Sequence, residues 1–191
     1  MNHNEFKRSY SDPCLYWKWH EDGLVIWLSW VDNCLCVGPK HLVKIEKEQM
    51  KKLFECDDVG DMKEYVGCKI DINRKEGIMK FTQPVLLQSY EDEFELPDTK
   101  KVYDTPAEPG SVLEKVKEGQ EVDKATQSKF RSGVGKLLHM MRWSRPEIWN
   151  AVRELSRRMQ VCNQHHMKAM LRTMKYGCDH KDVGWTLKPT R

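Results

Sequence analysis

One carboxylate, Asp32, stands between two apolar runs and could hold a metal ion. The runs are residues 24–30 and 34–38, and they flank Val31, Asp32 and Asn33. Two apolar strands around a turn-tolerant Asp-Asn pair predict a tight hairpin with Asp32 and Asn33 at its tip. Such a tip holds a carboxylate on rigid strands, as two-Mg²⁺ nucleotidyl transfer requires. An ordinary turn explains the same pair, so the hairpin alone leaves both interpretations open.

A second set of side chains has the ligand types of a zinc site. It is Cys162 and His165, followed by Cys178 and His180. Zinc prefers four such ligands in a tetrahedron, but the second pair is closer than the usual spacing and Lys and Arg surround it. Buried cysteines with a surface histidine are the alternative. The seven cysteines are odd in number and irregularly spaced, and no secretory signal is seen, so we expect a reducing compartment and no disulfide framework.

Hydrophobic periodicity predicts the elements that would position these side chains. Strands are expected at 14–20, 24–30, 34–37, 65–72 and 78–82, with helices at 41–54 and 84–94. Three further helices are expected between about 123 and 176, the second with Ser144 as its N-cap and Glu147 in a capping box. Residues 97–122 are rich in Pro and Gly and form a long connection. We therefore expect an α+β fold, with a β-rich first lobe and a helical second lobe.

The charges divide unequally between these lobes. Residues 1–124 contain 18 Lys and Arg against 25 Asp and Glu, whereas residues 125–191 contain 14 against 4. A strongly basic half indicates a polyanionic partner, nucleic acid first, although a solvated helical face explains the charge equally well. No stretch approaches the roughly 20 apolar residues of a membrane span, so no membrane partner is expected.

The segment from Trp30 to Gly38 resembles the aromatic-Val-Asp-Asp box of reverse transcriptases, and more closely that of the copia-type polymerase of LTR retrotransposons. Further blocks resemble that family in the same order along nearly the whole chain. They are 12–16, 65–70 with 81–83, 105–106, 130–138, 145–148, 151–156, and His166 with Ala169, Arg172 and Tyr176.

The resemblance implies a palm-and-thumb fragment. Residues 1–110 would be a partial palm with the catalytic hairpin and a primer-grip hairpin at 65–82, which includes Tyr65, Val66 and Gly67. The primer-grip hairpin would lie against the sheet of the catalytic hairpin and not against the thumb. Residues 111–122 would be a linker, 123–178 a helical thumb or connection, and 179–191 the lead-in to a ribonuclease H region. The family works in a cytoplasmic particle, and a nuclear location is the alternative.

The implied partners are an RNA or DNA template–primer, held through the phosphates by basic thumb side chains, and the missing fingers, palm half and ribonuclease H of the same polyprotein. The candidates are Lys129, Arg131, Lys136, Arg142 and Arg145. Ordinary solvated helix charges are the alternative for these residues.

The departures from the family pattern concern catalysis. The chain has no counterpart of the first catalytic Asp or of the fingers, since Asp12 belongs to a different block. The second Asp of the box is Asn33, whose amide oxygen can coordinate Mg²⁺ but brings no charge. The family's two Mg²⁺ ions would be reduced to at most one, weakly held by Asp32. We therefore expect an inactive fragment, with a non-catalytic nucleic-acid-binding module as the alternative. A protein-interaction remnant is the other alternative, in which an uncovered apolar palm surface packs on the missing fingers and palm half.

Overall fold

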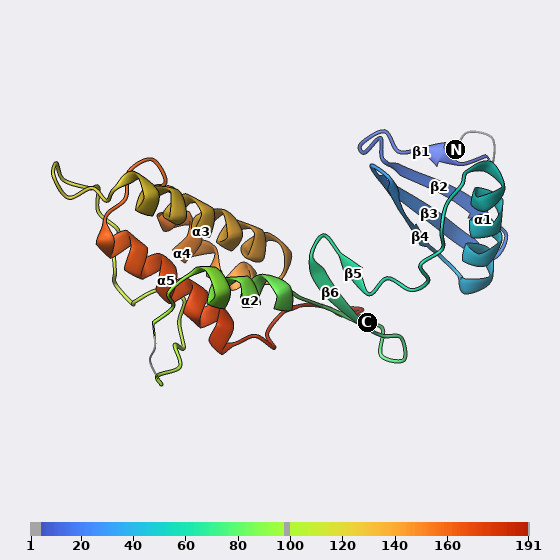
Figure 1. Ribbon diagram of the computed structural model, residues 1–191. Coiled ribbons are helices and arrows are strands. Elements are labelled where there is room, and N and C mark those ends of the chain that lie inside the picture. Colours follow the sequence, from blue (N-terminus) through green and yellow to red (C-terminus); the bar gives the residue numbers. More distant parts are fainter. Residues whose placement is uncertain (1–4, 98–99, 191) are drawn as a thin grey trace. The chain divides into compact units, whose positions relative to one another are not determined.

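The computed structural model describes residues 5–97 and 100–190. Within them lie two four-stranded antiparallel sheets and five α-helices (Figure 1). This mixture of antiparallel strands with separate helices agrees with the expected α+β class in its coarse form. The chain divides into two compact units, residues 1–61 and 62–191, so the two predicted hairpins belong to different units.

The first unit is an antiparallel sheet with one helix across it. The strands are β1 (Lys7–Arg8), β2 (Leu15–His20), β3 (Gly23–Trp30) and β4 (Asn33–Val37), in that order in the sheet, and the helix is α1 (Lys40–Leu53). Phe6, Val25, Trp27 and Leu42 form the core between the helix and the sheet. The predicted hairpin over 24–30 and 34–37 is confirmed, but Asn33, expected at its tip, is a paired residue of β4. Strand β1 was not expected, because two residues carry no periodic pattern.

A buried carboxylate fixes α1 on this sheet. The Glu46 side chain is 1% exposed, and its Oε1 lies 3.4 Å from Lys18 Nζ and 3.0 Å from His20 Nε2, both on β2. A buried charge is tolerated only when paired, so this contact sets the position of α1 along β2.

The second unit begins with a smaller sheet. Its strands are β5 (Glu64–Tyr65), β6 (Cys68–Asn73), β7 (Ile78–Thr82) and β8 (Trp185–Leu187). The single strand expected over 65–72 is wrong, because the backbone turns at Val66 and Gly67, with φ of 49° and 72°. Two successive positive φ values are typical of a type I′ hairpin turn. Strand β8 was also not expected.

Four α-helices form the rest of the second unit (Figure 1). They are α2 (Pro84–Glu93), α3 (Lys124–Trp143), α4 (Trp149–Ser156), which follows the short 3₁₀-helix η2 (Pro146–Ile148), and α5 (Gln164–Asp179). Their core includes Phe130, Leu137, Val152, Leu155 and Met170. These helices lie where the apolar spacing predicts them.

Ser144 has a different role from the one expected. It is the C-cap of α3, not the N-cap of the next helix. Its Oγ donates to Gln83 Oε1 at 2.7 Å, and both side chains are buried. The predicted N-cap is wrong because the Ser144 hydroxyl bonds the buried amide oxygen of Gln83 instead of a backbone N–H at a helix N-terminus.

The connection before α3 is irregular but held in place. Leu113 is buried, and its carbonyl accepts from the guanidinium of Arg158. The carbonyl of Glu114 lies 2.9 Å from His166 Nε2, and that of Pro106 accepts from Thr173 Oγ1 at 3.1 Å. Side chains of α5 and of the turn after α4 thus fasten this segment. None of the helices in the described ranges is long and apolar enough to cross a bilayer.

Candidate functional site

The hairpin β3–β4 presents Asp32 at its tip. Trp30 pairs with Asn33, so the turn consists of Val31 and Asp32 alone, and Asn33 is the first residue of β4. Val31 has a φ of 54°, a left-handed conformation that a β-branched residue rarely adopts. The paired strands on either side impose this geometry, which fixes the direction of the Asp32 side chain.

The side chains at this tip do not fit a pair of magnesium ions. Asn33 Nδ2 donates to Asp32 Oδ1 at 3.0 Å, so the amide acts as a donor to the carboxylate. Two-metal catalysis needs several carboxylates that bridge the ions, and this tip supplies one. In the described part of the chain, no group of three or more His, Cys, Asp or Glu side chains is placed to hold a metal.

Helix α5 separates the two halves of the predicted zinc site. Cys162 and Cys178 stand at opposite ends of this helix, and 16 residues of helix span about 24 Å. The Cys162 thiol is buried, and Cys178 Sγ lies 3.6 Å from the Leu87 carbonyl. Burial raises the pKa of the Cys178 thiol to about 11, which disfavours the thiolate that zinc needs. The structure therefore favours the buried-cysteine interpretation.

Of the residues expected in a primer grip, Tyr65 ends β5, and Val66 and Gly67 form the β5–β6 turn. The ring of Tyr65 meets that of Trp143 on α3 edge-on, with centroids 6.1 Å apart. This contact contradicts the expectation that the hairpin stays clear of the helices after residue 123. Tyr65 is a large apolar group, and it finds a partner within its own unit.

Three of the five basic candidates are occupied by contacts within the protein. Arg131 donates from Nε to the Met159 carbonyl at 2.7 Å and so caps the turn after α4. Lys136 Nζ lies 2.5 Å from Glu93 Oε1, which joins α3 to α2.

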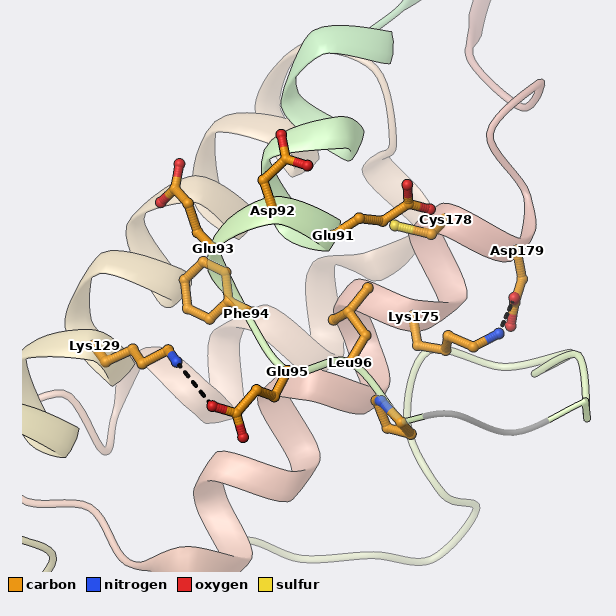
Figure 2. Close-up of a pocket in the computed structure, with 11 residues that line it drawn as sticks. Glu91, Asp92, Glu93, Phe94, Glu95, Leu96, Lys129, Lys175, Cys178 and Asp179 are labelled. Carbon is orange, nitrogen blue, oxygen red and sulfur yellow. Dashed lines mark hydrogen bonds and ion pairs between the residues drawn. The ribbon is translucent and has the colours of Figure 1, made fainter.

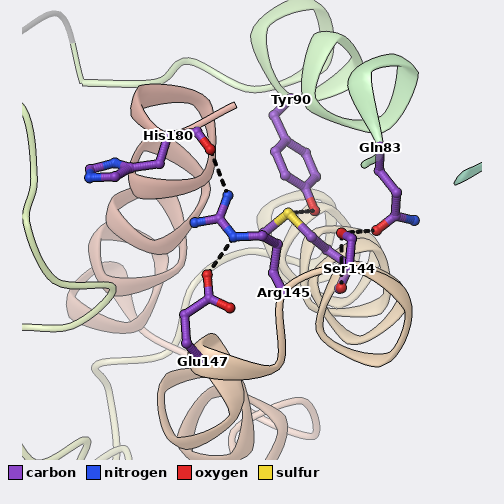
Figure 3. A network of polar contacts seen from close by, with 7 residues as sticks. Gln83, Tyr90, Ser144, Arg145, Glu147 and His180 are labelled. Carbon is purple, nitrogen blue, oxygen red and sulfur yellow. Dashed lines mark hydrogen bonds and ion pairs between the residues drawn. The ribbon is translucent and has the colours of Figure 1, made fainter. Parts of the chain in front are cut away.

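Arg145 is the most enclosed of the five. It is 1% exposed, and it donates to Glu147 and to the His180 carbonyl (Figure 3). In this structure Arg145 is not accessible to a phosphate, and its charge stabilises the packing of α5.

Lys129 lies at an acidic groove. The groove, about 580 Å³, surrounds the C-terminal end of α2 (Figure 2), and its carboxylates come from Glu91, Asp92, Glu93, Glu95 and Asp179. Lys129 Nζ is 4.0 Å from Glu95 Oε1. Carboxylates at this distance offset the attraction of the ammonium group for a phosphate.

Arg142 is exposed at the end of α3, its guanidinium carbon 5.8 Å from the Trp143 ring centroid. Exposed basic residues that the sequence reasoning missed extend this surface: Lys124 on α3 and Arg153 and Arg157 on or directly after α4. The exposure of Arg153 and Arg157 could have been predicted from the sequence. Together with Trp149 they recur every four positions, on the side of α4 opposite its apolar residues.

One face of the β1–β4 sheet is apolar and exposed. Residues alternate between faces along a strand, so those not turned toward α1 share the other face. Lys7 lies on this face with its Nζ 5.2 Å from the Trp17 ring centroid. The apolar residues of the face, of which six are half-exposed and three exposed, are Leu15, Trp17, Trp19, Leu24, Ile26, Leu28, Trp30, Leu35 and Val37. Trp19 is 68% exposed and Trp30 is 60% exposed. Exposed apolar surface of this extent is typical of an interaction site.

The chain resembles one part of a much longer protein. It is 28% identical over 180 residues to the Retrovirus-related Pol polyprotein from transposon TNT 1-94 of Nicotiana tabacum. This likeness supports an origin in a retrotransposon Pol polyprotein. The match covers 92% of this chain and 14% of the tobacco protein, so it includes both compact units. No protein-family model matches the chain, and no solved structure matches it.

Proposed function

We propose that the chain is the palm-and-thumb part of a copia-type reverse transcriptase, that it binds a template–primer, and that it does not polymerise by itself. The observation that carries this proposal is the β3–β4 hairpin. Its two-residue turn presents Asp32 where the resemblance puts the catalytic box. The relation to a Pol polyprotein along nearly the whole chain supports the same origin.

Catalytic incompetence follows from the chemistry of the hairpin tip. A nucleotidyl transfer that uses two metal ions needs carboxylates to bridge them and to offset their charge. Asp32 supplies one carboxylate, and Asn33 donates a hydrogen bond to it. No step of polymerisation is therefore assigned to this chain alone.

Nucleic-acid binding is supported by the basic character of the helical part. Helix α3 contains five Lys and Arg residues and no Asp or Glu. Phosphate contacts by such side chains dominate affinity and do not depend on base sequence. Arg142 and the exposed arginines of α4 are better placed for them than Arg131, Lys136 or Arg145, which have partners inside the protein.

Two assays test this proposal on the purified 191-residue chain. Primer extension with Mg²⁺ should give no product above that of Asp32→Ala, and extension that Asp32→Ala abolishes would refute incompetence. A labelled primer–template should bind, with log K falling linearly as log salt rises. No binding at low salt would refute the nucleic-acid proposal.

A second candidate function is protein docking through the exposed apolar face of the β1–β4 sheet. We propose as its partner the fingers and palm half that the resemblance to reverse transcriptases implies. Burial of aromatic side chains dominates interface energetics, and Trp19 and Trp30 lie on this face. Co-expression with that part should give a complex that Trp19→Lys weakens at least tenfold. Tyr10→Lys, at a fully exposed aromatic residue outside the strands, is the matched control. Equal recovery with both variants would exclude this face.

A further inference from the structure

Three side chains form a line on the outer surface of α4. Trp149, Arg153 and Arg157 follow one another at four-residue intervals, and such residues share a helix face. The opposite face of α4 carries Ala151, Val152 and Leu155, which are buried in the helical core. The line therefore points away from the core of its own unit.

Trp149 is not needed to complete the helical core. It is 56% exposed, whereas Val152 and Leu155 of the same helix are almost fully buried. Its neighbours along the line are arginines, which makes an apolar protein partner or the interior of a bilayer a poor match. An aromatic face between guanidinium groups suits a ligand that combines flat rings with negative charge.

The charge on this line is available to a ligand. The Arg153 side chain is exposed and makes no hydrogen bond or ion pair within residues 5–97 and 100–190. The Arg157 side chain is 58% exposed, and its Nη1 forms an ion pair with Glu154 Oε1 at 3.2 Å. At that exposure a surface ion pair is weak and can exchange Glu154 for a phosphate.

The line is also held rigidly. Arg131 on α3 donates to the carbonyls of Met159 at 2.7 Å and Gln160 at 3.2 Å, directly after α4. These bonds fix the C-terminal end of α4 against α3, so a ligand meets side chains on a supported helix.

We propose that Trp149, Arg153 and Arg157 form a contact for single-stranded nucleic acid. A base stacks on the Trp149 ring, and backbone phosphates bind the two arginines. This inference rests on the proposed nucleic-acid binding and adds the strand class. In a duplex the base faces are already stacked on one another, so the ring has no base face to cover.

The test measures fluorescence anisotropy of the full chain with a labelled single strand and with the same sequence as a blunt duplex. Trp149→Leu should lower single-strand affinity by about five- to a hundred-fold, and leave duplex affinity within twofold. Trp149→Phe, which retains an aromatic face, should restore most of the affinity. Arg153→Gln should reduce the salt slope for the single strand by about 0.7.

Lys168→Gln is the matched charge control, since Lys168 is exposed on α5. An effect of Lys168→Gln equal to that of Arg153→Gln would overturn the assignment to this line. If Trp149→Leu binds the single strand within twofold of wild type, the assignment to this line is also overturned. The proposed nucleic-acid binding would be retained in that case, because the chain still binds. Absence of binding to either nucleic acid at low salt would overturn both.

Discussion

The Nη1 atom of Arg145 donates to the backbone oxygen of His180 at 3.0 Å and joins the segment after α3 to the end of α5 (Figure 3). The guanidinium carbon also lies 5.2 Å from the ring centroid of Tyr176. A positive charge is thus enclosed by a carbonyl, a carboxylate and an aromatic face.

Replacing Arg145 should destabilise the helical unit. Arg145→Met removes the charge-assisted bonds to Glu147 and to the His180 carbonyl, which keeps only its bond from the Val183 backbone N–H. The free energy of unfolding should fall by about 2–4 kcal/mol, measured by urea denaturation with helical circular dichroism. Arg142→Met, at an exposed position, is the control and should change it by less than about 0.5 kcal/mol. Equal effects would contradict the structural role of Arg145.

Two glycines on α3 should respond in opposite directions to alanine. A Cβ on Gly133 would lie within 3 Å of the ends of Met170 and Met174, whereas one on Gly135 would meet nothing within 4 Å. Gly133→Ala gains helix propensity but forces the ends of two fully buried methionines to move, so it should destabilise the chain by up to about 2 kcal/mol net. Gly135→Ala should stabilise it by up to about 1 kcal/mol through helix propensity. Thermal melts of the pair check this, and the same sign for both would be the contrary result.

Acid should weaken the N-terminal end of α5 through His166. Burial, foremost, lowers the pKa of this imidazole from its ordinary value of 6.5. Its Nδ1 lies 3.4 Å from the Asn163 backbone nitrogen and accepts from it, while Nε2 meets the Glu114 carbonyl. The unfolded chain therefore takes up the proton first, so stability is complete above pH 6.5 and falls below it. The slope for one proton is at most about 1.4 kcal/mol per pH unit.

The variant His166→Gln isolates this effect from other titrating groups. Glutamine can still donate to the Glu114 carbonyl, but it does not titrate. Urea denaturation at pH 5, 6 and 7 should show a smaller loss of stability on acidification than in the wild type. Parallel curves for the two proteins would exclude His166 as the source.

The β5–β6 turn should accept a better turn residue. Val66 has a φ of 49° and is followed by Gly67, and Asn-Gly is the preferred pair for a type I′ turn. Val66→Asn should raise the free energy of unfolding by about 1 kcal/mol, because it removes a left-handed β-branched residue. Val66→Ile is the control and should give no gain. A destabilised Asn variant would mean that Val66 makes an apolar contact worth more than the strain.

Salt dependence should separate an exposed cation from an occupied one. Arg142→Gln should reduce the slope of log K against log salt for a primer–template by about one. Lys136→Gln should leave the slope unchanged and lower the melting temperature, since Lys136 bridges α3 to Glu93 on α2. A loss of slope in Lys136→Gln would show that the lysine leaves this carboxylate when nucleic acid binds.

The long elements could be predicted from the sequence because their apolar period is set locally. The runs on either side of Asp32 are apolar enough to specify the β3–β4 hairpin, and Phe130 to Leu137 specify the buried face of α3. Strand β8 could not be found this way. Three residues have no period of their own, and pairing with β7 more than 100 positions earlier makes them a strand.

The candidate side chains were predicted less well than the elements that carry them. Arg131, Lys136 and Arg145 have the right residue type for phosphates, but their partners are a turn carbonyl, Glu93 and His180, all remote in sequence. Residue type alone does not reveal such tertiary partners. Exposure likewise cannot be read from charge alone, which is why Arg153 and Trp149 were missed.

The pairing of β7 with β8 has a consequence for how the second unit forms. Trp185 lies beside Phe81, with all four helices α2 to α5 between them in the chain. Until Trp185 leaves the ribosome, β7 has an unpaired edge that can pair with a strand of another chain. Contacts of such high sequence separation also slow folding. Pairing of β8 thus replaces the five-residue open edge of β7 by a three-residue edge, which is a poorer template for a strand of another chain.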